Sequence, residues 1–263
     1  MSFLRSQMNA PSRAAALNSS PKAGSMRTGL GVAGAVLGLA LAGSAHLERQ
    51  SDVAQGVSQA FETVSERIAP SVVRIESGQR TQGGVRPLGE GSGFVLDESG
   101  LIVTNAHVVA GAGRITVRTE SERASRGARL VMFDPATDVA ILHVPGLESP
   151  APDWVDDAAR GTDAVIAGYP GGGPLTLGKA RVRGQILVAD DTGPGSREVH
   201  VFRGLVRPGN SGGALLDLQG SVIGLVFANA QDDDRTGFAL TYEEVSGAIE
   251  STRSATSEVS SGS

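Results

Sequence analysis

Residues 93–103 read Gly93-Phe-Val-Leu-Asp-Glu-Ser-Gly-Leu-Ile-Val103, two short apolar runs separated by the turn residues 98–100. Short apolar runs bounded by turn residues are typical of strands in an all-β sandwich or barrel. The same texture continues from Ser71 onward, with runs at 72–75, 115–117, 130–133, 139–144, 164–167, 182–188, 199–202, 214–216, 222–228 and 238–240. About twelve strands exceed what one small barrel holds, so we expect two packed β-barrels.

Two helices are expected to flank these strands. The N-terminal helix is indicated by apolar residues that recur at helical spacing and end before Pro70, namely Val53, Val57, Phe61, Val64 and Ile68. The short C-terminal helix begins near Thr241, which has capping-box spacing with Glu244. The tail, residues 251–263, is rich in Ser and Thr and is expected to be disordered.

Composition excludes several classes of protein. The chain of 263 residues contains no cysteine, which excludes a disulfide framework, a thiol nucleophile and a Cys-ligated metal site. Its formal net charge of -5 argues against a nucleic-acid binder that works by neutralising phosphates.

The N-terminal region has the charge pattern of a membrane anchor. Residues 1–27 carry only positive charges, and residues 28–45 contain no charged residue, about the minimum length that crosses a bilayer as a helix. We therefore predict a cytoplasmic basic leader at 1–27, a transmembrane anchor at 28–45, a polar linker at 46–52 and an exported folded domain at 53–250. The alternative is a cleaved signal peptide, with Gly43 and Ala45 as the small residues before the cut.

The stretch Gly209-Asn210-Ser211-Gly212-Gly213 indicates a nucleophile. Glycines on both sides of a serine allow a sharp turn that points backbone N–H groups at one spot, where they can hold the anion formed when a carbonyl is attacked. Such a serine needs a base. Four histidines are available: His46 lies at the predicted membrane boundary, His143 and His200 lie within predicted strands, and His107 follows a strand at the edge of an element.

Chain order decides between the known serine arrangements. Residues 209–213 also fit G-x-S-x-G, but in the α/β-hydrolases the histidine follows the serine, and no histidine follows Ser211. The subtilisin order needs an α/β sheet that this pattern does not provide. The order His, Asp, Ser remains, which places the acid between His107 and Ser211. Asp138 directly precedes an apolar strand, whereas Asp134 precedes a proline and is more typical of a turn.

Three motifs in this order carry a family resemblance. They are Gly91-Ser-Gly-Phe-Val-Leu followed by Thr104-Asn-Ala-His107, then Thr137-Asp-Val-Ala-Ile-Leu142, then Pro208-Gly-Asn-Ser-Gly-Gly213. Together they resemble the trypsin-like serine proteases of the HtrA/Deg family. Arg203–Gly213, Thr236–Thr241 and Gly168–Gly173 further resemble the MarP-type membrane-anchored periplasmic proteases of actinobacteria. The resemblance covers roughly residues 60–250.

The resemblance implies a chymotrypsin-like double β-barrel and a serine endopeptidase that needs no cofactor or metal. It implies His107 as general base and acid, Asp138 as its orienting partner and Ser211 as nucleophile. The backbone N–H groups of Gly209 and Ser211 would form the oxyanion hole. Unlike HtrA proteins the chain is expected to lack a PDZ domain, and unlike MarP-type proteins it has one candidate span and no disulfide.

The resemblance also locates a substrate pocket. The residue about six positions before the serine is Leu205, and Val226 and Phe227 are expected to complete the pocket. The apolar pocket predicts cleavage after small or medium apolar residues. The family resemblance implies cell-envelope polypeptides as substrates, and the N-terminal charge pattern predicts that the protease domain lies outside the cytoplasm. Two alternatives stay open: a catalytically silent binding or scaffold module on the same fold, and an esterase-like hydrolase. The run Asp232-Asp233-Asp234 is expected to be a solvated loop rather than a cation site.

Overall fold

A computed structural model describes residues 59–122, 124–155, 158–189 and 196–261. The compact unit that contains the predicted strands runs from Ala60 to Ser263. The leader, anchor and linker predicted at 1–27, 28–45 and 46–52 lie outside the described residues, as do His46 and the start of the predicted N-terminal helix. Across the described ranges, no helix combines the length and apolar character needed to cross a membrane.

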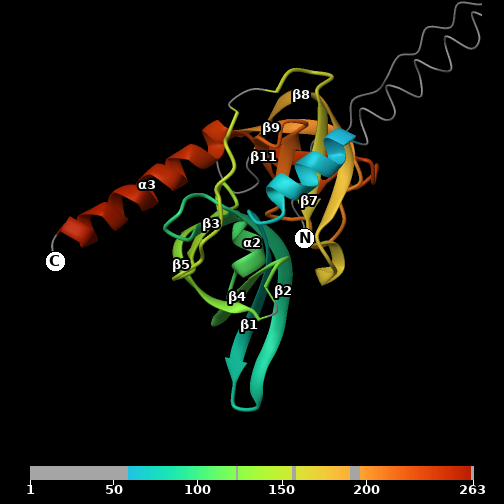
Figure 1. Cartoon of the computed structure of the whole chain (residues 1–263). Coiled ribbons are helices and arrows are strands. Elements are labelled where there is room, and N and C mark those ends of the chain that lie inside the picture. Colours follow the sequence, from blue (N-terminus) through green and yellow to red (C-terminus); the bar gives the residue numbers. More distant parts are fainter. Residues whose placement is uncertain (1–58, 123, 156–157, 190–195, 262–263) are drawn as a thin grey trace, which may run out of the picture. The chain divides into compact units, whose positions relative to one another are not determined.

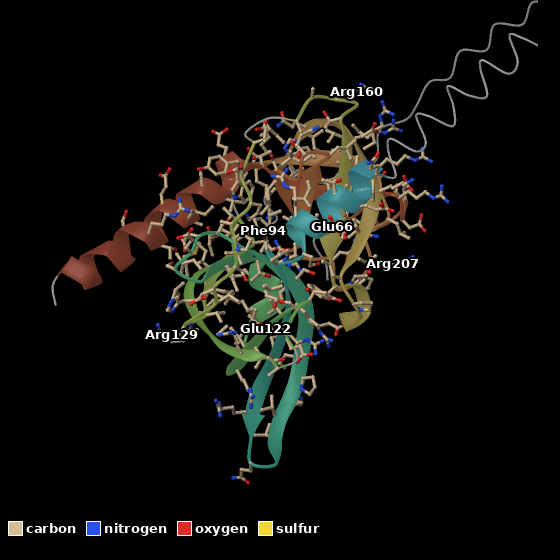
Figure 2. All side chains as sticks on the ribbon, viewed as in Figure 1. Glu66, Phe94, Glu122, Arg129, Arg160 and Arg207 are labelled. Carbon is tan, nitrogen blue, oxygen red and sulfur yellow. The ribbon has the colours of Figure 1, made fainter. Side chains whose placement is uncertain are left out.

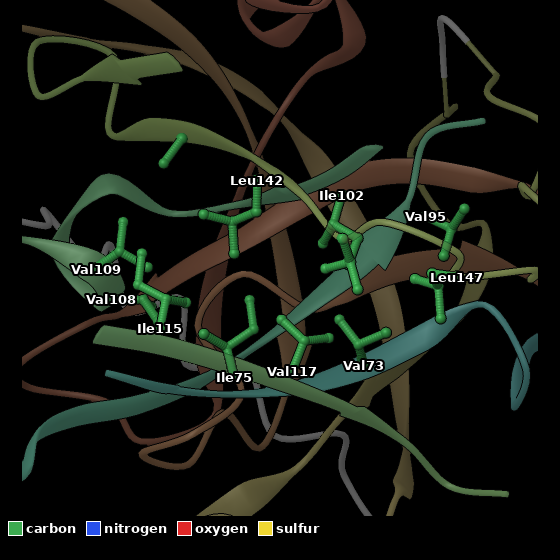
Figure 3. Packing of buried hydrophobic residues seen from close by; sticks show 12 residues of the cluster. Val73, Ile75, Val95, Ile102, Val108, Val109, Ile115, Val117, Leu142 and Leu147 are labelled. Carbon is green, nitrogen blue, oxygen red and sulfur yellow. The ribbon is translucent and has the colours of Figure 1, made fainter. Parts of the chain in front are cut away.

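The first barrel contains six antiparallel strands closed in the order β1-β2-β3-β6-β5-β4. The strands are β1 (Val72–Thr81), β2 (Gly84–Val95), β3 (Leu101–Thr104), β4 (Arg114–Thr119), β5 (Arg126–Asp134) and β6 (Val139–His143). Figure 3 shows the side chains that fill its interior. They are largely β-branched, as suits a pleated and closely packed surface, and include Val73, Ile75, Ile102, Val117 and Leu142.

The second barrel is also closed, in the order β10-β11-β12-β9-β8-β7. Its strands are β7 (Asp163–Gly168), β8 (Thr176–Ala189), β9 (Ser196–Gly204), β10 (Ala214–Asp217), β11 (Val222–Asn229) and β12 (Thr236–Leu240). Its core centres on the fully buried ring of Phe202, packed with residues that include Val182, Leu215 and Val226. The predicted all-β double barrel is therefore confirmed, and each predicted apolar run coincides with one of these strands (Figure 1).

Aromatic residues join the two barrels. The ring of Phe94, at the end of β2, lies 5.3 Å from that of Trp154 in the connection between the barrels, and Trp154 lies 5.4 Å from Tyr242. Phe94 is fully buried, and Figure 2 shows it near the middle of the unit, whereas Arg129, Arg160 and Arg207 lie at the periphery. The hydroxyl of Tyr169, just after β7, donates to the Val72 carbonyl of β1 at 3.2 Å.

Helical segments are few. Residues 59–68 are helical, with Val64 and Ile68 buried against the body. A short helix, α2 (Ala106–Val109), follows β3, and a 3-10 turn, η1 (Pro170–Gly172), follows β7. The chain closes with α3 (Tyr242–Ser261), which extends away from the barrels in Figure 1.

The C-terminal helix differs from its prediction in two respects. Thr241 and Glu244 do not cap each other, because both reach the backbone of Glu198: Thr241 donates to its carbonyl at 3.4 Å and Glu244 accepts its N–H at 2.7 Å. The expected disorder from residue 251 is replaced by helix up to Ser261. Arg253 holds this part of the helix to the first barrel, donating to the Leu96 carbonyl at 3.2 Å.

Candidate active site

His107 lies on α2, in the connection between β3 and β4 of the first barrel. Asp138 lies at the end of the turn between β5 and β6, immediately before the buried strand β6. Asp138 has a φ of 60, and in the described part it is the only residue other than glycine with positive φ. Aspartate tolerates this left-handed conformation better than most residues, because its short side chain makes local hydrogen bonds.

Five contacts tie the turn to the histidine helix and the residue before it. The carboxylate of Asp138 lies 2.8 Å (Oδ2) and 3.1 Å (Oδ1) from the Nδ1 atom of His107, and Oδ1 also accepts the His107 backbone N–H at 2.9 Å. The carbonyl of Asp138 accepts the Ala106 N–H at 3.2 Å and the Asn105 side-chain amide at 3.0 Å. The side chain of Asp138 is 17% exposed and that of His107 is 49% exposed. This arrangement fixes the ring and leaves its Nε2 side open to a substrate.

Ser211 lies in the tight turn that precedes β10 of the second barrel. Gly209 and Gly212 on either side have φ of 95 and 82, a region that favours glycine. A methyl group on Gly212 would collide with the Ser92 carbonyl and the Thr104 hydroxyl, so the turn is pressed against the first barrel. The spacing of glycines around the serine is therefore a steric requirement of this fold.

The serine and histidine segments meet at Gly91 of β2. A methyl group on Gly91 would lie 2.7 Å from the Val108 side chain, next to His107, and 3.0 Å from the Ser211 carbonyl oxygen. The Ser211 hydroxyl donates to the Phe227 carbonyl at 3.5 Å. Among the described residues no hydrogen bond joins the Ser211 hydroxyl to His107. Catalytic hydrogen bonds of free enzymes are often long and tighten when substrate binds.

Backbone donors are available beside the Ser211 hydroxyl. Within the described ranges, the N–H groups of Gly209 and Ser211 have no acceptor. The neighbouring carbonyls are already engaged: Gly171 donates to Pro208 at 2.8 Å, and Gly213 donates to Asn210 at 2.9 Å. Two unpaired backbone N–H groups in the turn that carries the serine are the kind of donors that stabilise an anionic carbonyl oxygen.

The three predicted pocket residues differ in their surroundings. Leu205 is 42% exposed and lies just after β9. Phe227 is half-buried on β11, and its ring lies 6.3 Å from that of Phe238. Val226 is fully buried in the core of the second barrel.

The other predicted polar residues have local roles. Asp134 accepts the N–H of Ala136 at 2.9 Å and the hydroxyl of Thr137 at 2.7 Å, as expected of a turn residue. Burial acts to raise the pKa of Asp134, but these hydrogen bonds, with the charge of Arg197, outweigh it and lower the pKa below its usual value. Asp233 likewise accepts the Thr236 hydroxyl at 2.7 Å, and this bond lowers the pKa of Asp233.

The two other histidines of the described ranges, His143 and His200, lie away from these contacts. The Nδ1 atom of His143 lies 2.8 Å from the Arg129 guanidinium, and His200 is fully buried on β9. Across the described residues, no group of three or more His, Asp or Glu side chains is arranged to hold a metal ion.

Sequence reasoning did not single out three residues that shape this site. Asn105 joins the histidine helix to the Asp138 turn, and its position between a strand and His107 is a signal that was available. Tyr169 packs at the seam, where burial, with the negative charge of Glu120, raises the pKa of its hydroxyl. Ser92 bonds to Gly209, 117 residues away, and to Tyr169, 77 residues away, and no local pattern indicates these contacts.

Two closed six-stranded barrels, with a His–Asp pair on one and a glycine-flanked serine on the other, define a chymotrypsin-like fold with the groups of a serine-peptidase site. The chain belongs to the family of trypsin-like peptidases, since the profile for the "Trypsin-like peptidase domain" matches residues 91–225. This confirms the resemblance predicted from the three motifs.

Curated proteins and solved structures agree with this family. Serine protease Rv3671c of Mycobacterium tuberculosis strain H37Rv is 43% identical over 187 residues, which cover 68% of this chain and 45% of that protein. A crystal structure of the Rv3671c protease from M. tuberculosis in its active form has a TM-score of 0.64 and 43% identity, covering 70% of this chain and 81% of that one. A probable periplasmic serine endoprotease, DegP-like, of Pseudomonas putida F1 is 33% identical over 185 residues, 70% of this chain and 37% of that protein. The chain thus spans less than half the length of these curated relatives.

Proposed function

We propose that this protein is a serine endopeptidase that hydrolyses peptide bonds through an acyl-enzyme on Ser211, with His107 and Asp138 as the other members of the triad. The observation that carries the proposal is the 2.8 Å contact between the Asp138 carboxylate and His107 Nδ1, made at the seam that also holds Ser211. The names of the similar proteins, serine protease and serine endoprotease, support it.

The first half of the reaction forms the acyl-enzyme. The carboxylate of Asp138 accepts the Nδ1–H of His107, which leaves Nε2 unprotonated and able to accept the Ser211 hydroxyl proton. The Ser211 oxygen attacks the substrate carbonyl carbon, and the carbonyl oxygen becomes an anion held by the N–H groups of Gly209 and Ser211. His107 then gives its proton to the leaving amine, and the peptide C–N bond breaks.

The second half repeats these steps with water. Water attacks the ester carbon while His107 accepts its proton, and the same two N–H groups hold the anion. Collapse of the intermediate returns the proton to the Ser211 oxygen and releases the carboxylate product. The polypeptide alone supplies every group in this cycle, so neither a metal nor an organic cofactor is required by it.

Labelling by a fluorophosphonate probe tests the proposal. The probe reacts with serines that are activated by a base, so we expect phosphonylation of Ser211 in the wild-type protein and none in Ser211→Ala or His107→Ala. His143→Ala is the matched control, because this histidine contacts Arg129 instead of the triad, and it should label normally. Absence of labelling in a folded wild-type protein that retains residues 59–261 would refute the proposed activity.

One observation favours a second candidate, a binding or scaffold module without catalysis. The Ser211 hydroxyl is directed to the Phe227 carbonyl rather than to His107. A module of this kind would bind a peptide at the same seam and leave it uncut. Mass spectrometry of a bound peptide after prolonged incubation separates the two, because only the endopeptidase yields two fragments.

The proposed substrates are polypeptides of the cell envelope, encountered outside the cytoplasm. The charge pattern of residues 1–45 supports this location through an anchor at 28–45, and one relative is named as probably periplasmic. Detection of residues 28–45 by mass spectrometry in the membrane fraction tests the anchor. Recovery of a mature chain that begins after Ala45 would support the signal-peptide alternative instead.

The proposed specificity is for a small or medium apolar residue before the cleaved bond. Leu205 is apolar and exposed, and Phe227 is half-buried and accepts the Ser211 hydroxyl through its backbone carbonyl. Cleavage of a peptide library, read by mass spectrometry, should show Ala, Val or Leu at this position. A dominant preference for Arg or Lys would overturn the proposal.

A further inference from the structure

Ser92 makes an unusual set of contacts at the seam. It lies on β2 of the first barrel and is fully buried. Its hydroxyl donates to the Gly209 carbonyl at 2.7 Å and accepts the Tyr169 N–H at 2.8 Å. Its backbone N–H donates to the Ser211 carbonyl at 2.8 Å. One residue of the first barrel thus contacts both Gly209 and Ser211, the two residues proposed to form the oxyanion hole.

The direction of these bonds is fixed. A serine hydroxyl has a single proton, and since Tyr169 N–H is itself a donor, the proton of Ser92 goes to the Gly209 carbonyl. In a trans peptide unit the C=O and N–H groups point in opposite directions. Fixing the Gly209 carbonyl therefore also directs the next N–H, and the Asn210 N–H donates away from Ser92, to the Arg207 carbonyl at 2.9 Å.

The three peptide units of the turn are held in the same manner. The Pro208 carbonyl accepts from Gly171, the Gly209 carbonyl accepts from Ser92, and the Asn210 carbonyl accepts from Gly213. The Gly209 N–H shares a peptide unit with the Pro208 carbonyl, and the Ser211 N–H shares one with the Asn210 carbonyl, so the outer two bonds fix the direction of both N–H groups and the Ser92 bond fixes the unit between them. Of these three donors, only Ser92 acts through a side chain, so only here can a substitution remove the donor alone.

We infer that Ser92 is a positioning residue of the oxyanion hole: its hydroxyl joins the segment after β7 to the Gly209 peptide and keeps both N–H donors aimed at the reacting carbonyl. The inference rests on the proposed function. Without this hydroxyl, two buried groups lose their partner, the Gly209 carbonyl and the Tyr169 N–H. Gly209 has no side chain to resist rotation, so its peptide turns toward other partners and the alignment of the donors is lost.

The expected kinetic effect lies in kcat. Loss of one donor to an oxyanion lowers kcat by about 10²–10³-fold, and misalignment of donors that remain present should cost less. We therefore expect Ser92→Ala to lower kcat by about ten- to a hundred-fold with KM within about twofold, because the donors act mainly in the transition state. A peptidyl boronate forms a tetrahedral adduct with an oxygen in the position of the oxyanion, so its affinity should fall by the same factor. The affinity for the product peptide, which carries no such oxyanion, should stay unchanged.

Ser77→Ala is the matched control. Ser77 is a buried serine of the same barrel, on β1, and its hydroxyl donates to the carbonyl of another β2 glycine, Gly89, at 3.2 Å. It contacts no residue of the turn at 208–213. Its loss removes a single hydrogen bond, so the thermal midpoint should fall by less than in Ser92→Ala and kcat should stay within twofold of wild type.

A second variant guards against loss of the fold. Ser92→Cys keeps a side chain of similar shape but replaces the hydroxyl by a weak donor, so it should fold and show the same kcat loss. Wild-type kcat and boronate affinity in either folded Ser92 variant would overturn the inference while leaving the proposed function intact. Failure of the wild-type protein to turn over any peptide would instead overturn the proposed function, and this inference with it.

Discussion

The substitution Asp138→Asn isolates the part of the site that the structure describes most fully. It keeps the size of the side chain and leaves the turn before β6 unchanged. The two oxygens of the Asp138 carboxylate accept the backbone N–H and the Nδ1–H of His107. A carboxamide has a single acceptor oxygen, so the asparagine can accept only one of these two hydrogen bonds. The new NH₂ group faces Nδ1 and favours the tautomer that carries its proton on Nε2, which cannot accept a proton from Ser211.

The magnitude follows from the distances. Unit charges about 4 Å apart attract by about 4 kcal/mol at an effective dielectric constant of about 20, which is a factor of about 10³ in rate if it stabilises the protonated histidine only in the transition state. The 49% exposure of the imidazole reduces this figure through solvent screening. The unfavourable tautomer adds to the loss of rate. In serine peptidases, replacing the triad aspartate by asparagine lowers kcat by about 10⁴ for this reason. We expect kcat to fall by about 10³–10⁴-fold, with KM within a few-fold of wild type.

The assay is hydrolysis of a peptide ending in an apolar residue and a chromogenic leaving group, measured at pH 7 with thermal midpoints recorded alongside. Asp134→Asn is the matched control, since its carboxylate lies four residues earlier in the same turn region and bonds to Ala136 and Thr137 instead. It should retain kcat within a few-fold. An Asp138→Asn variant with the wild-type midpoint and a kcat reduced by less than tenfold would refute the role of this carboxylate.

Three further predictions concern stability. Gly212→Ala should lower the free energy of unfolding by about 2–4 kcal/mol, measured by urea denaturation. The residue has φ of 82, and its new methyl group would meet the Ser92 carbonyl. A loss under 1 kcal/mol would contradict this steric argument, because the turn would then relax around the methyl group. Phe202→Ala should cost about 3–5 kcal/mol, since the ring is fully buried in the second barrel, and a loss below 1.5 kcal/mol would contradict that packing. Asp134→Ala should cost about 1 kcal/mol at pH 7. Because the folded-state pKa of Asp134 is lowered, its contribution is present above the ordinary value of 3.8 and is lost as the pH falls through the folded-state pKa. The difference in thermal midpoint between Asp134→Ala and wild type should therefore shrink below about pH 4, and a difference that is constant with pH would exclude this ionisation.

The sequence predicts the double barrel well because each strand is a local feature. Runs such as 139–144 and 214–216 are short, apolar and bounded by turn residues, and six strands are enough to close each barrel. The register shifts are not visible in the same way. The irregularity between Ser77 and Gly78 depends on how β1 pairs with β2 along a hairpin, which is set by contacts across strands rather than by residue type.

The C-terminal helix shows where local patterns mislead. Thr241 and Glu244 have the spacing of a capping box, but the nearby strand β9 offers the backbone of Glu198, and both side chains bond to it. Composition predicts a disordered tail, yet the helix continues to Ser261. The Thr252 hydroxyl bonds back to the Ala248 carbonyl, and Arg253 reaches Leu96 and Asp97 of the first barrel. These tertiary contacts outweigh the weak helix propensity of Ser and Thr.

For the candidate site, chain order and turn chemistry lead to His107, Asp138 and Ser211 without any structure. The positions of the supporting residues cannot be obtained in that way. Ser92 and Gly209 are 117 residues apart, and their hydrogen bond exists only because two barrels meet at this seam. Val226 packs in the core of the second barrel, and its place in the substrate pocket stays a prediction. The membrane anchor at 28–45 lies outside the described residues and stays a prediction.

The most direct measurement is a crystal structure of the protein with a peptidyl boronic acid that ends in an apolar residue. The proposed mechanism predicts a covalent bond from the Ser211 oxygen to boron, with one boronate oxygen about 2.7–3.1 Å from the N–H groups of Gly209 and Ser211 and another within hydrogen-bond distance of His107 Nε2. A saturated complex in which boron is not bonded to Ser211, or in which His107 stays out of reach of the boronate, would contradict it.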